Sequence, residues 1–246
     1  MSLTVRFLGC GDAFGSGGRF QTCFLCEDGR WRFLVDCGAS SLIAMRRFGV
    51  DFTSIDAVAL THLHGDHFGG LPFFLLASKF HRRARPLIIA GPAGSAERVR
   101  QAQEVLYPGS SRAPLGFDVE FREWRDGEGR ELLEGVEATP HRVEHPSGAE
   151  AFAIAIRAGG RRFGYSGDTD WCDGLERAAA GANLFVCEAY TWTRQARFHM
   201  CHRTLQERQA ALRSGKIIIT HMDEEVLRLK DASPFVAAED GMTVSV

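Results

Sequence analysis

The stretch that decides the fold reads Thr61-His62-Leu63-His64-Gly65-Asp66-His67-Phe68-Gly69-Gly70. It carries three histidines and one aspartate within six positions, although the whole chain has only nine histidines. The mainly apolar run Ile55–Leu60 before it is typical of a buried strand, and the glycines after it indicate a turn. Loops at the ends of strands commonly carry functional side chains. We therefore start from the hypothesis that this stretch is a binding site.

The residue types in this stretch are those that bind metal ions. Imidazole and carboxylate groups are good ligands for zinc, manganese and iron. Side chains two positions apart in extended backbone point to the same side, so His62 and His64 can share one ion. Asp66 and His67 follow Gly65, where the chain can bend, and can face a second ion or a water bound to it. A polar turn with incidental histidines is the alternative, and the density of ligand types argues against it.

The pattern His-x-His-x-Asp-His at 62–67 resembles the signature of the metallo-β-lactamase superfamily of hydrolases. The resemblance implies an α+β fold, a four-layer αββα sandwich of two mixed sheets flanked by helices. It also implies a site for two metal ions at one edge, with further ligands downstream. Asp36-Cys37-Gly38 resembles the superfamily's early Asp-x-Gly element, which supports the metal loop there without binding metal.

Composition places the chain among ordinary globular proteins. Its 246 residues are 45% hydrophobic and 24% charged, and we interpret 1–246 as a single domain. The net charge of −2 gives no global argument for a nucleic-acid partner. No apolar run approaches the ~20 residues of a bilayer span, and the N-terminus lacks the pattern of a signal peptide. We therefore expect a cytoplasmic protein without a membrane partner.

Seven cysteines are scattered along the chain. An odd, scattered set argues against a disulfide framework and agrees with a reducing compartment. The pair Cys23-x-x-Cys26 invites a zinc or redox interpretation, but it lies in a predicted strand and no second pair follows. We favour small, half-buried residues at these two positions.

Hydrophobic periodicity predicts the secondary structure. Strands are expected at 3–9, 22–26, 31–35, 55–60, 86–90, 117–124, 131–139, 151–156, 161–165, 184–187, 217–219 and 243–246. Helices are expected at 39–48, 71–80, 95–106, 174–180, 205–214 and 222–229, the first with Leu42, Ile43 and Met45 on its inner side. Strands dominate early in each half, which agrees with two sheets packed face to face and covered by helices.

The resemblance places further ligands after other predicted strands. His145 takes the position of the third histidine, ahead of the strand at 151–156, and His141 stays open as its rival. Asp168, in Ser-Gly-Asp-Thr at 166–169, matches the element whose aspartate bridges both metals; a helix N-cap is the alternative. His221, after the apolar run at 216–220, matches the last histidine ligand. One metal would be held by His62, His64 and His145, the other by Asp66, His67 and His221, with Asp168 between them.

These ligands indicate the chemistry of the site. Histidine and carboxylate groups without thiolate favour two divalent ions, zinc first, with manganese or iron as alternatives. Such ions would lower the pKa of a bridging water to near neutrality, which makes hydroxide available as a nucleophile. Asp66 can both bind metal and orient this hydroxide.

Two residues downstream resemble the ribonuclease Z-like branch of the superfamily, whose members hydrolyse phosphodiesters. In that branch a glutamate and a histidine form a pair that protonates the leaving oxygen. Carried over, Glu188 would orient His202 of His202-Arg203-Thr204 as the general acid and raise its pKa. His199 is the rival for the acid. The structural alternative is an exposed acid and a histidine near a helix cap.

One departure from ribonuclease Z bears on the substrate. The long glycine-rich and basic arm of those enzymes has no room here, because only two strands and a turn fit between His145 and Asp168. Together with the slightly acidic balance, this argues against structured RNA as a partner. We expect a phosphodiesterase for a small phosphodiester of the nucleotide or cyclic nucleotide type.

Other functions stay open at this point. A carboxyl ester, lactone or thioester hydrolase would use the same metal ligands, and a non-catalytic, metal-stabilised binding domain would be expected to lack one of them. The sequence leaves the oligomeric state open, with a homodimer as one expectation.

Overall fold

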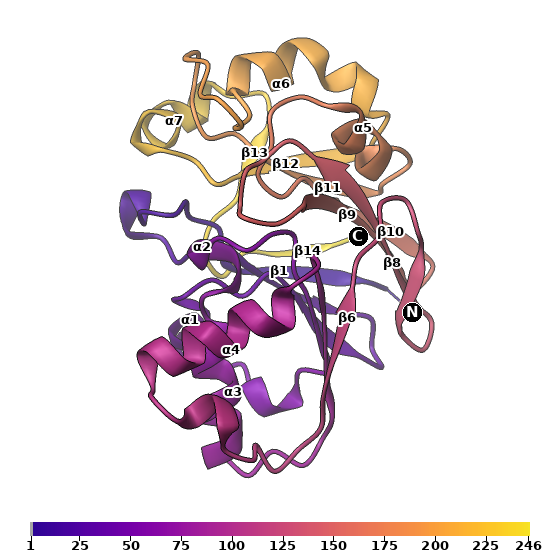
Figure 1. Ribbon diagram of the computed structural model, residues 1–246. Coiled ribbons are helices and arrows are strands. Elements are labelled where there is room, and N and C mark those ends of the chain that lie inside the picture. Colours follow the sequence, from indigo (N-terminus) through magenta and orange to yellow (C-terminus); the bar gives the residue numbers. More distant parts are fainter. Residues whose placement is uncertain (1) are drawn as a thin grey trace.

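The computed structural model describes residues 2–246 and shows two seven-stranded sheets (Figure 1). Met1, the first residue of the predicted domain, lies outside the described residues. In spatial order the first sheet contains β14 (Thr243–Ser245), β1 (Thr4–Gly9), β2 (Cys23–Glu27), β3 (Arg32–Val35), β4 (Ala57–Ala59), β5 (Leu87–Gly91) and β6 (Val119–Glu123). The second contains β13 (Val236–Ala237), β12 (Lys216–Thr220), β11 (Leu184–Glu188), β10 (Arg161–Tyr165), β9 (Ala151–Ala158), β8 (Val136–Val143) and β7 (Arg130–Leu133).

Helices cover the outer face of each sheet (Figure 1). The first sheet is covered by α1 (Ser41–Arg47), α3 (Leu71–Phe80) and α4 (Ser95–Leu106), and the second by α5 (Asp173–Ala179), α6 (His202–Arg208) and α7 (Glu224–Leu229). A single turn, α2 (Gly65–Phe68), lies within the histidine-rich loop. This is the predicted four-layer αββα sandwich. None of the helices described between residues 2 and 246 is long and apolar enough to cross a membrane.

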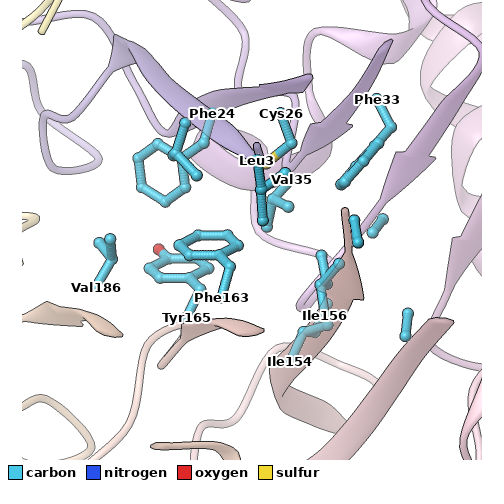
Figure 2. Close-up of a cluster of buried hydrophobic side chains, with 14 of the residues drawn as sticks. Leu3, Phe24, Cys26, Phe33, Val35, Ile154, Ile156, Phe163, Tyr165 and Val186 are labelled. Atoms are coloured by element: carbon cyan, nitrogen blue, oxygen red, sulfur yellow. The ribbon is translucent and has the colours of Figure 1, made fainter. Parts of the chain in front are cut away.

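Alternate residues of a central strand reach different layers of the sandwich. In β2, Phe24 and Cys26 lie between the two sheets, whereas Cys23 and Leu25 face the helices. Figure 2 shows Phe24 above Tyr165 of the other sheet, with ring centroids 4.9 Å apart in an edge-to-face contact. Burial on both faces explains why these strands are nearly continuous apolar runs. Because Cys23 and Cys26 lie on opposite faces of β2, both fully buried, they form no joint site.

The parallel parts of both sheets converge on one edge. Strands β3 to β6 run parallel to one another, and so do β10 to β13. Backbone hydrogen bonds join the segments of the two sheets at this edge, since Phe152 N donates to Thr61 O (3.0 Å) and His221 N donates to Cys10 O (3.1 Å). Loops at the carboxyl ends of parallel strands can therefore aim side chains from both sheets at one place.

Three details of the predicted elements are wrong. The segment 131–139 is not one strand, because Gly135 (φ 78°) supplies a left-handed turn that makes it the hairpin β7–β8. Ile43 of α1 has 63% of its surface exposed, since the buried stripe of this short helix runs through Ala44 and Met45. The helix expected at 205–214 begins at His202 and ends at Arg208.

Candidate metal centre

The side chains predicted as metal ligands lie together at the edge where the parallel strands end. They come from the loop after β4, the loop after β8 and the turns after β10 and β12. They fall into two groups, in each of which one ligand atom per residue lies within 4.8 Å of the others: His62, His64 and His145, and Asp66, His67, Asp168 and His221. These groups have the composition expected from the sequence, and metal binding by them stays a prediction.

Asp168 lies between the two groups. Its Oδ1 is 3.3 Å from His67 Nε2, and its Oδ2 is 3.4 Å from His221 Nε2. On the other side, the same Oδ2 lies 3.9 Å from His62 Nε2 and 3.8 Å from His145 Nε2. One carboxylate thus faces histidines of both groups, as a bridging ligand must.

Within each group the ligand atoms point at one another. In the first group, His145 Nε2 lies 3.0 Å from His64 Nδ1. In the second, Asp66 Oδ2 lies 3.2 Å from both His67 Nε2 and His221 Nε2. Nitrogen and oxygen atoms gathered in this way are the donor set that zinc, manganese or iron accepts.

Several atoms at the centre are buried without a hydrogen-bond partner: His62 Nε2, His67 Nε2, Asp168 Oδ1 and His221 Nδ1. Orphaned buried polar atoms are uncommon in proteins, and a cation is one of the few groups that satisfies them. Burial lowers the pKa of His62 well below 6.5 and that of His145 to about 4, so both rings are neutral, as metal ligands must be. The residues present therefore fit divalent cations.

Two other histidines balance the charge of the carboxylates. Burial by itself would lower the pKa of His221, but the nearby Asp168 and Asp66 carboxylates outweigh burial and raise it to about 9. The pKa of His67 is likewise raised well above its usual value, because Asp168, Asp66 and Asp36 outweigh its burial. A divalent cation would replace these two protons as the counter-charge.

Asp36 supports the loop from behind. Its Oδ1 accepts from Thr61 N (2.8 Å), and its Oδ2 accepts from Thr61 Oγ1 (2.8 Å) and His67 Nδ1 (2.7 Å). The last bond fixes the tautomer of His67 and leaves Nε2 to face the centre. A Cβ added at Gly38 would lie 2.2 Å from Asp66 O, so only glycine fits there. This is the supporting role that the Asp-x-Gly element implied.

His145, and not His141, reaches the centre. His145 Nδ1 donates to Phe198 O (3.1 Å), which leaves Nε2 to face His64. His141 instead lies within β8, paired with Ala153 of β9. The strand holds His141 away from the other candidate ligands. Of the two histidines that the sequence left open, His145 is therefore the one that lies at the centre.

The predicted pairing of Glu188 with His202 is wrong. Glu188 ends β11, and its Oε2 lies 2.9 Å from Nδ1 of His199, the rival candidate. His202 begins α6, where its ring stacks on Trp192 at 3.9 Å and its Nε2 lies 2.8 Å from Ser233 Oγ. Because α6 begins at His202, the ring of this residue packs against Trp192 and does not reach Glu188. The acid role itself stays a prediction, and the structure moves it to His199.

His199 opens onto a pocket of about 180 Å³ lined by Ala13, Phe14, His64, Asp66, Asp168, Tyr190, His199 and His221. Burial lowers the pKa of His199, and burial followed by the Asp168 charge raises that of Glu188 well above its usual value. A neighbouring carboxylate was expected to raise the pKa of the acid histidine, but at His199 the effect of burial is larger and the pKa is lowered. Because Nδ1 contacts Glu188, Nε2 is the nitrogen left for a ligand. Sequence reasoning missed Phe14 and Tyr190; for Tyr190 the signal was its position two residues after the strand-end Glu188.

Glu188 and His199 also have a second geometric option. Together with Asp168 and His221 they form a third group whose ligand atoms lie within 4.8 Å of one another. The pair could therefore bind a cation instead of moving a proton, and the two roles predict different effects of mutation.

The fold and the His-x-His-x-Asp-His centre define a metallo-β-lactamase-fold protein of the ribonuclease Z-like group. The chain belongs to the family described as Anti-Pycsar protein Apyc1, whose model matches residues 3–238. Ribonuclease Z of Mycobacterium bovis (strain BCG / Pasteur 1173P2) is 31% identical over 194 residues, 75% of this chain and 69% of the relative. Ribonuclease Z of Lachnoclostridium phytofermentans is 32% identical over 159 residues, 65% of this chain. The matched segment spans 50% of that relative.

Solved structures show the same fold. Human tRNase Z, short form, has a TM-score of 0.81 and 22% identity over 99% of both chains. The metallo-beta-lactamase fold protein YhfI from Bacillus subtilis has a TM-score of 0.80 and 20% identity, over 100% of this chain and 99% of its own. A diphosphatase from the PhnP family has a TM-score of 0.78 and 17% identity, over 99% of this chain and 98% of its own.

Proposed function

We propose that this protein is a metal-dependent phosphodiesterase that hydrolyses a small phosphodiester of the nucleotide or cyclic nucleotide type. The observation that carries the proposal is the contact between Glu188 and His199 beside the metal centre, with His199 Nδ1 4.0 Å from Asp168 Oδ2. Expelling an alkoxide from a phosphodiester requires a proton at the leaving oxygen. A histidine held at this position by a buried carboxylate can donate it.

The chain's own groups divide the work of the reaction. Two divalent ions, zinc first and manganese or iron as alternatives, would be held by the seven ligands; they would activate a water and offset the phosphate charge. Asp66, which lines the pocket, would accept a hydrogen bond from the attacking water and orient it. His199 Nε2 would pass a proton to the leaving oxygen, and Glu188 would stabilise the ring through Nδ1.

The size of the pocket supports a small substrate over structured RNA. Its volume of about 180 Å³ is less than the ~300 Å³ at which typical ligand sites begin. Between His145 and Asp168 the chain forms only β9, β10 and their short connections, with no arm that could grasp a folded RNA. The names ribonuclease Z and diphosphatase of two relatives support cleavage at phosphorus.

The test uses leaving groups that differ in their need for a proton. Zinc- or manganese-loaded protein is offered adenosine 3′,5′-cyclic monophosphate, bis-p-nitrophenyl phosphate and a lactone in parallel. We expect both phosphodiesters to be hydrolysed. His199→Ala should lower kcat about 100-fold or more for the cyclic nucleotide, whose leaving group is an alkoxide, and much less for the activated nitrophenyl ester.

Two controls make the result specific. His202→Ala removes the stacked histidine three positions away and should leave both activities close to wild type. Metal content should be unchanged in His199→Ala, because a general acid is not a ligand. Turnover of the lactone alone would contradict the proposal and favour the carboxyl ester or lactone alternative, which uses the same metal ligands.

A further inference from the structure

A phenylalanine stands in solvent at the mouth of the pocket. Phe14 lies in the loop between β1 and β2, and 85% of its surface is exposed, although it lines the same pocket as the metal centre. Exposed apolar side chains are common one by one. Here the exposed residue lines the same pocket as the buried Asp66, Asp168 and His221, which makes it part of the site.

The loop holds this ring in place. The buried Asp12 carboxylate accepts from Phe14 N (3.2 Å), Ser16 N (2.8 Å) and Ser16 Oγ (2.7 Å). On the other side of the ring's residue, Gln21 Nε2 donates to Ala13 O (3.0 Å). Side-chain bonds to the backbone on both sides of Phe14 define the loop conformation, so the ring is presented to solvent by the structure and does not fold back onto the core.

The pocket leaves part of the substrate outside. A volume of about 180 Å³ takes a phosphodiester and its nearest carbons, but it is smaller than the ~300 Å³ at which sites for whole ligands begin. The rest of a nucleotide would then lie outside this pocket, and Phe14 is the exposed side chain among the residues that line it. The other aromatic residue that lines the pocket besides the histidines is Tyr190, whose ring already packs against His199 with ring centroids 4.8 Å apart.

We propose that Phe14 is the platform on which the substrate's nucleobase stacks, so that the site takes nucleoside phosphodiesters in preference to phosphodiesters without a base. This inference rests on the proposed phosphodiesterase function and names the substrate class of the same site. Stacking on one ring recognises any base, because every base has a π-face. Phe14 therefore gives affinity for the nucleoside, whereas the metal centre acts on the phosphorus.

The experiment compares two cyclic phosphodiesters with the same six-membered phosphate ring. One is adenosine 3′,5′-cyclic monophosphate, and the other is the cyclic phosphate of propane-1,3-diol, which has no base. Phe14→Ala should raise KM roughly tenfold for the nucleotide with kcat unchanged, and should leave both parameters unchanged for the base-free diester. Phe14→Trp should keep the wild-type KM, because the indole also stacks.

The matched control is Phe80→Ala. Phe80 ends α3 and is 75% exposed, so the substitution removes the same group from solvent, and Phe80 does not line the pocket. It should change neither substrate's kinetics. If Phe14→Ala weakens both substrates equally, or weakens neither, the stacking inference is overturned.

A binding measurement separates this inference from the proposed function. Calorimetry with adenosine 5′-monophosphate, the product, measures stacking without catalysis. We expect Phe14→Ala to weaken binding roughly tenfold, and Phe14→Trp to restore it. If the wild-type protein hydrolyses neither diester, the phosphodiesterase proposal fails, and an unchanged dissociation constant in Phe14→Ala overturns the stacking inference independently.

Discussion

Replacing Asp36 by asparagine tests how the metal loop is held. The carboxylate is fully buried and accepts hydrogen bonds from Thr61 N, Thr61 Oγ1 and His67 Nδ1. In Asp36→Asn the amide oxygen can still accept from Thr61 N, whereas the amide N–H group faces the other two atoms. A donor opposite Nδ1 favours the tautomer of His67 that carries its proton on Nε2. That proton would occupy the position of the metal.

The magnitude follows from this change of tautomer. One ligand of the second group must give up its preferred tautomer before it can bind. Thr61 Oγ1, which loses its carboxylate acceptor, lies 3.0 Å from Nδ1 of His62, so the support of this first-group ligand is disturbed as well. Loss of such a supporting hydrogen bond lowers metal affinity about 10- to 100-fold, or ~1.4–2.7 kcal/mol. Because the amide is nearly the same size as the carboxylate, we expect the fold to survive.

The assay is competition for zinc between the protein and a chelating dye at pH 7.5, with circular dichroism to check folding. Asp28→Asn is the matched control. Asp28 is also a buried carboxylate that accepts from backbone N–H groups, those of Arg30 (2.9 Å) and Trp31 (2.7 Å), but it lies in the turn between β2 and β3. The Asp28→Asn variant should bind zinc with the affinity of the wild type. An Asp36→Asn variant that also binds zinc with wild-type affinity would refute the reasoning.

Three further predictions concern metal, pH and the core. Zinc binding should release protons at pH 7, and zinc affinity should rise as the pH approaches 9, because His221, whose pKa is raised to about 9, must deprotonate to bind metal. Calorimetry in buffers of different ionisation enthalpy measures the protons released. Zinc binding without proton release would contradict the prediction. Removing the metal with a chelator should lower Tm, since a ligand of the native state stabilises it; an unchanged Tm would mean that no metal is bound. Phe24→Ala should lower the free energy of unfolding, measured in urea, by about 3–5 kcal/mol, because Phe24 packs edge to face on Phe7 and Tyr165 between the sheets. Phe80 is exposed, so Phe80→Ala should change this free energy by less than ~0.5 kcal/mol.

The clustering of the candidate ligands could be predicted from their places near the ends of apolar strands together with the resemblance to a known signature. His62 follows β4 of the first sheet, and Asp168 and His221 follow β10 and β12 of the second, each within three residues of the strand's end. The parallel strands of each sheet end at the edge where the two sheets are joined. Knowing that a segment is a buried strand thus places the next few residues in space. The spacing of His62 and His64 adds a shared direction, and the resemblance to a known signature adds the remaining partners.

The position of the proposed general acid could not be predicted in the same way. His199 lies in the irregular segment between β11 and α6, and its orientation depends on Phe198, which has a left-handed backbone (φ 68°). The sequence does not predict a positive φ at Phe198, because bulky residues rarely adopt this conformation. The His-x-Thr pattern pointed instead to His202, whose place in the first turn of α6 directs it onto Trp192.

The platform proposed at Phe14 was hidden for a related reason. The glycines around it indicated only a flexible loop, whereas the structure shows Asp12 accepting hydrogen bonds that hold the loop in one shape. The bonds are local, but composition does not reveal which side chain they leave exposed. The same holds for Ile43, whose outward direction depends on how a short helix sits on its sheet.

The central claim, that the clustered histidines and carboxylates hold two divalent ions that together hydrolyse a phosphodiester, is tested most directly by titrating the chelator-treated protein with zinc or manganese. Bound metal and hydrolysis of bis-p-nitrophenyl phosphate are followed in the same samples. We predict that binding saturates at two ions per chain and that activity reaches its maximum only with the second. Saturation at one ion, or two bound ions without phosphodiester hydrolysis, would contradict the claim.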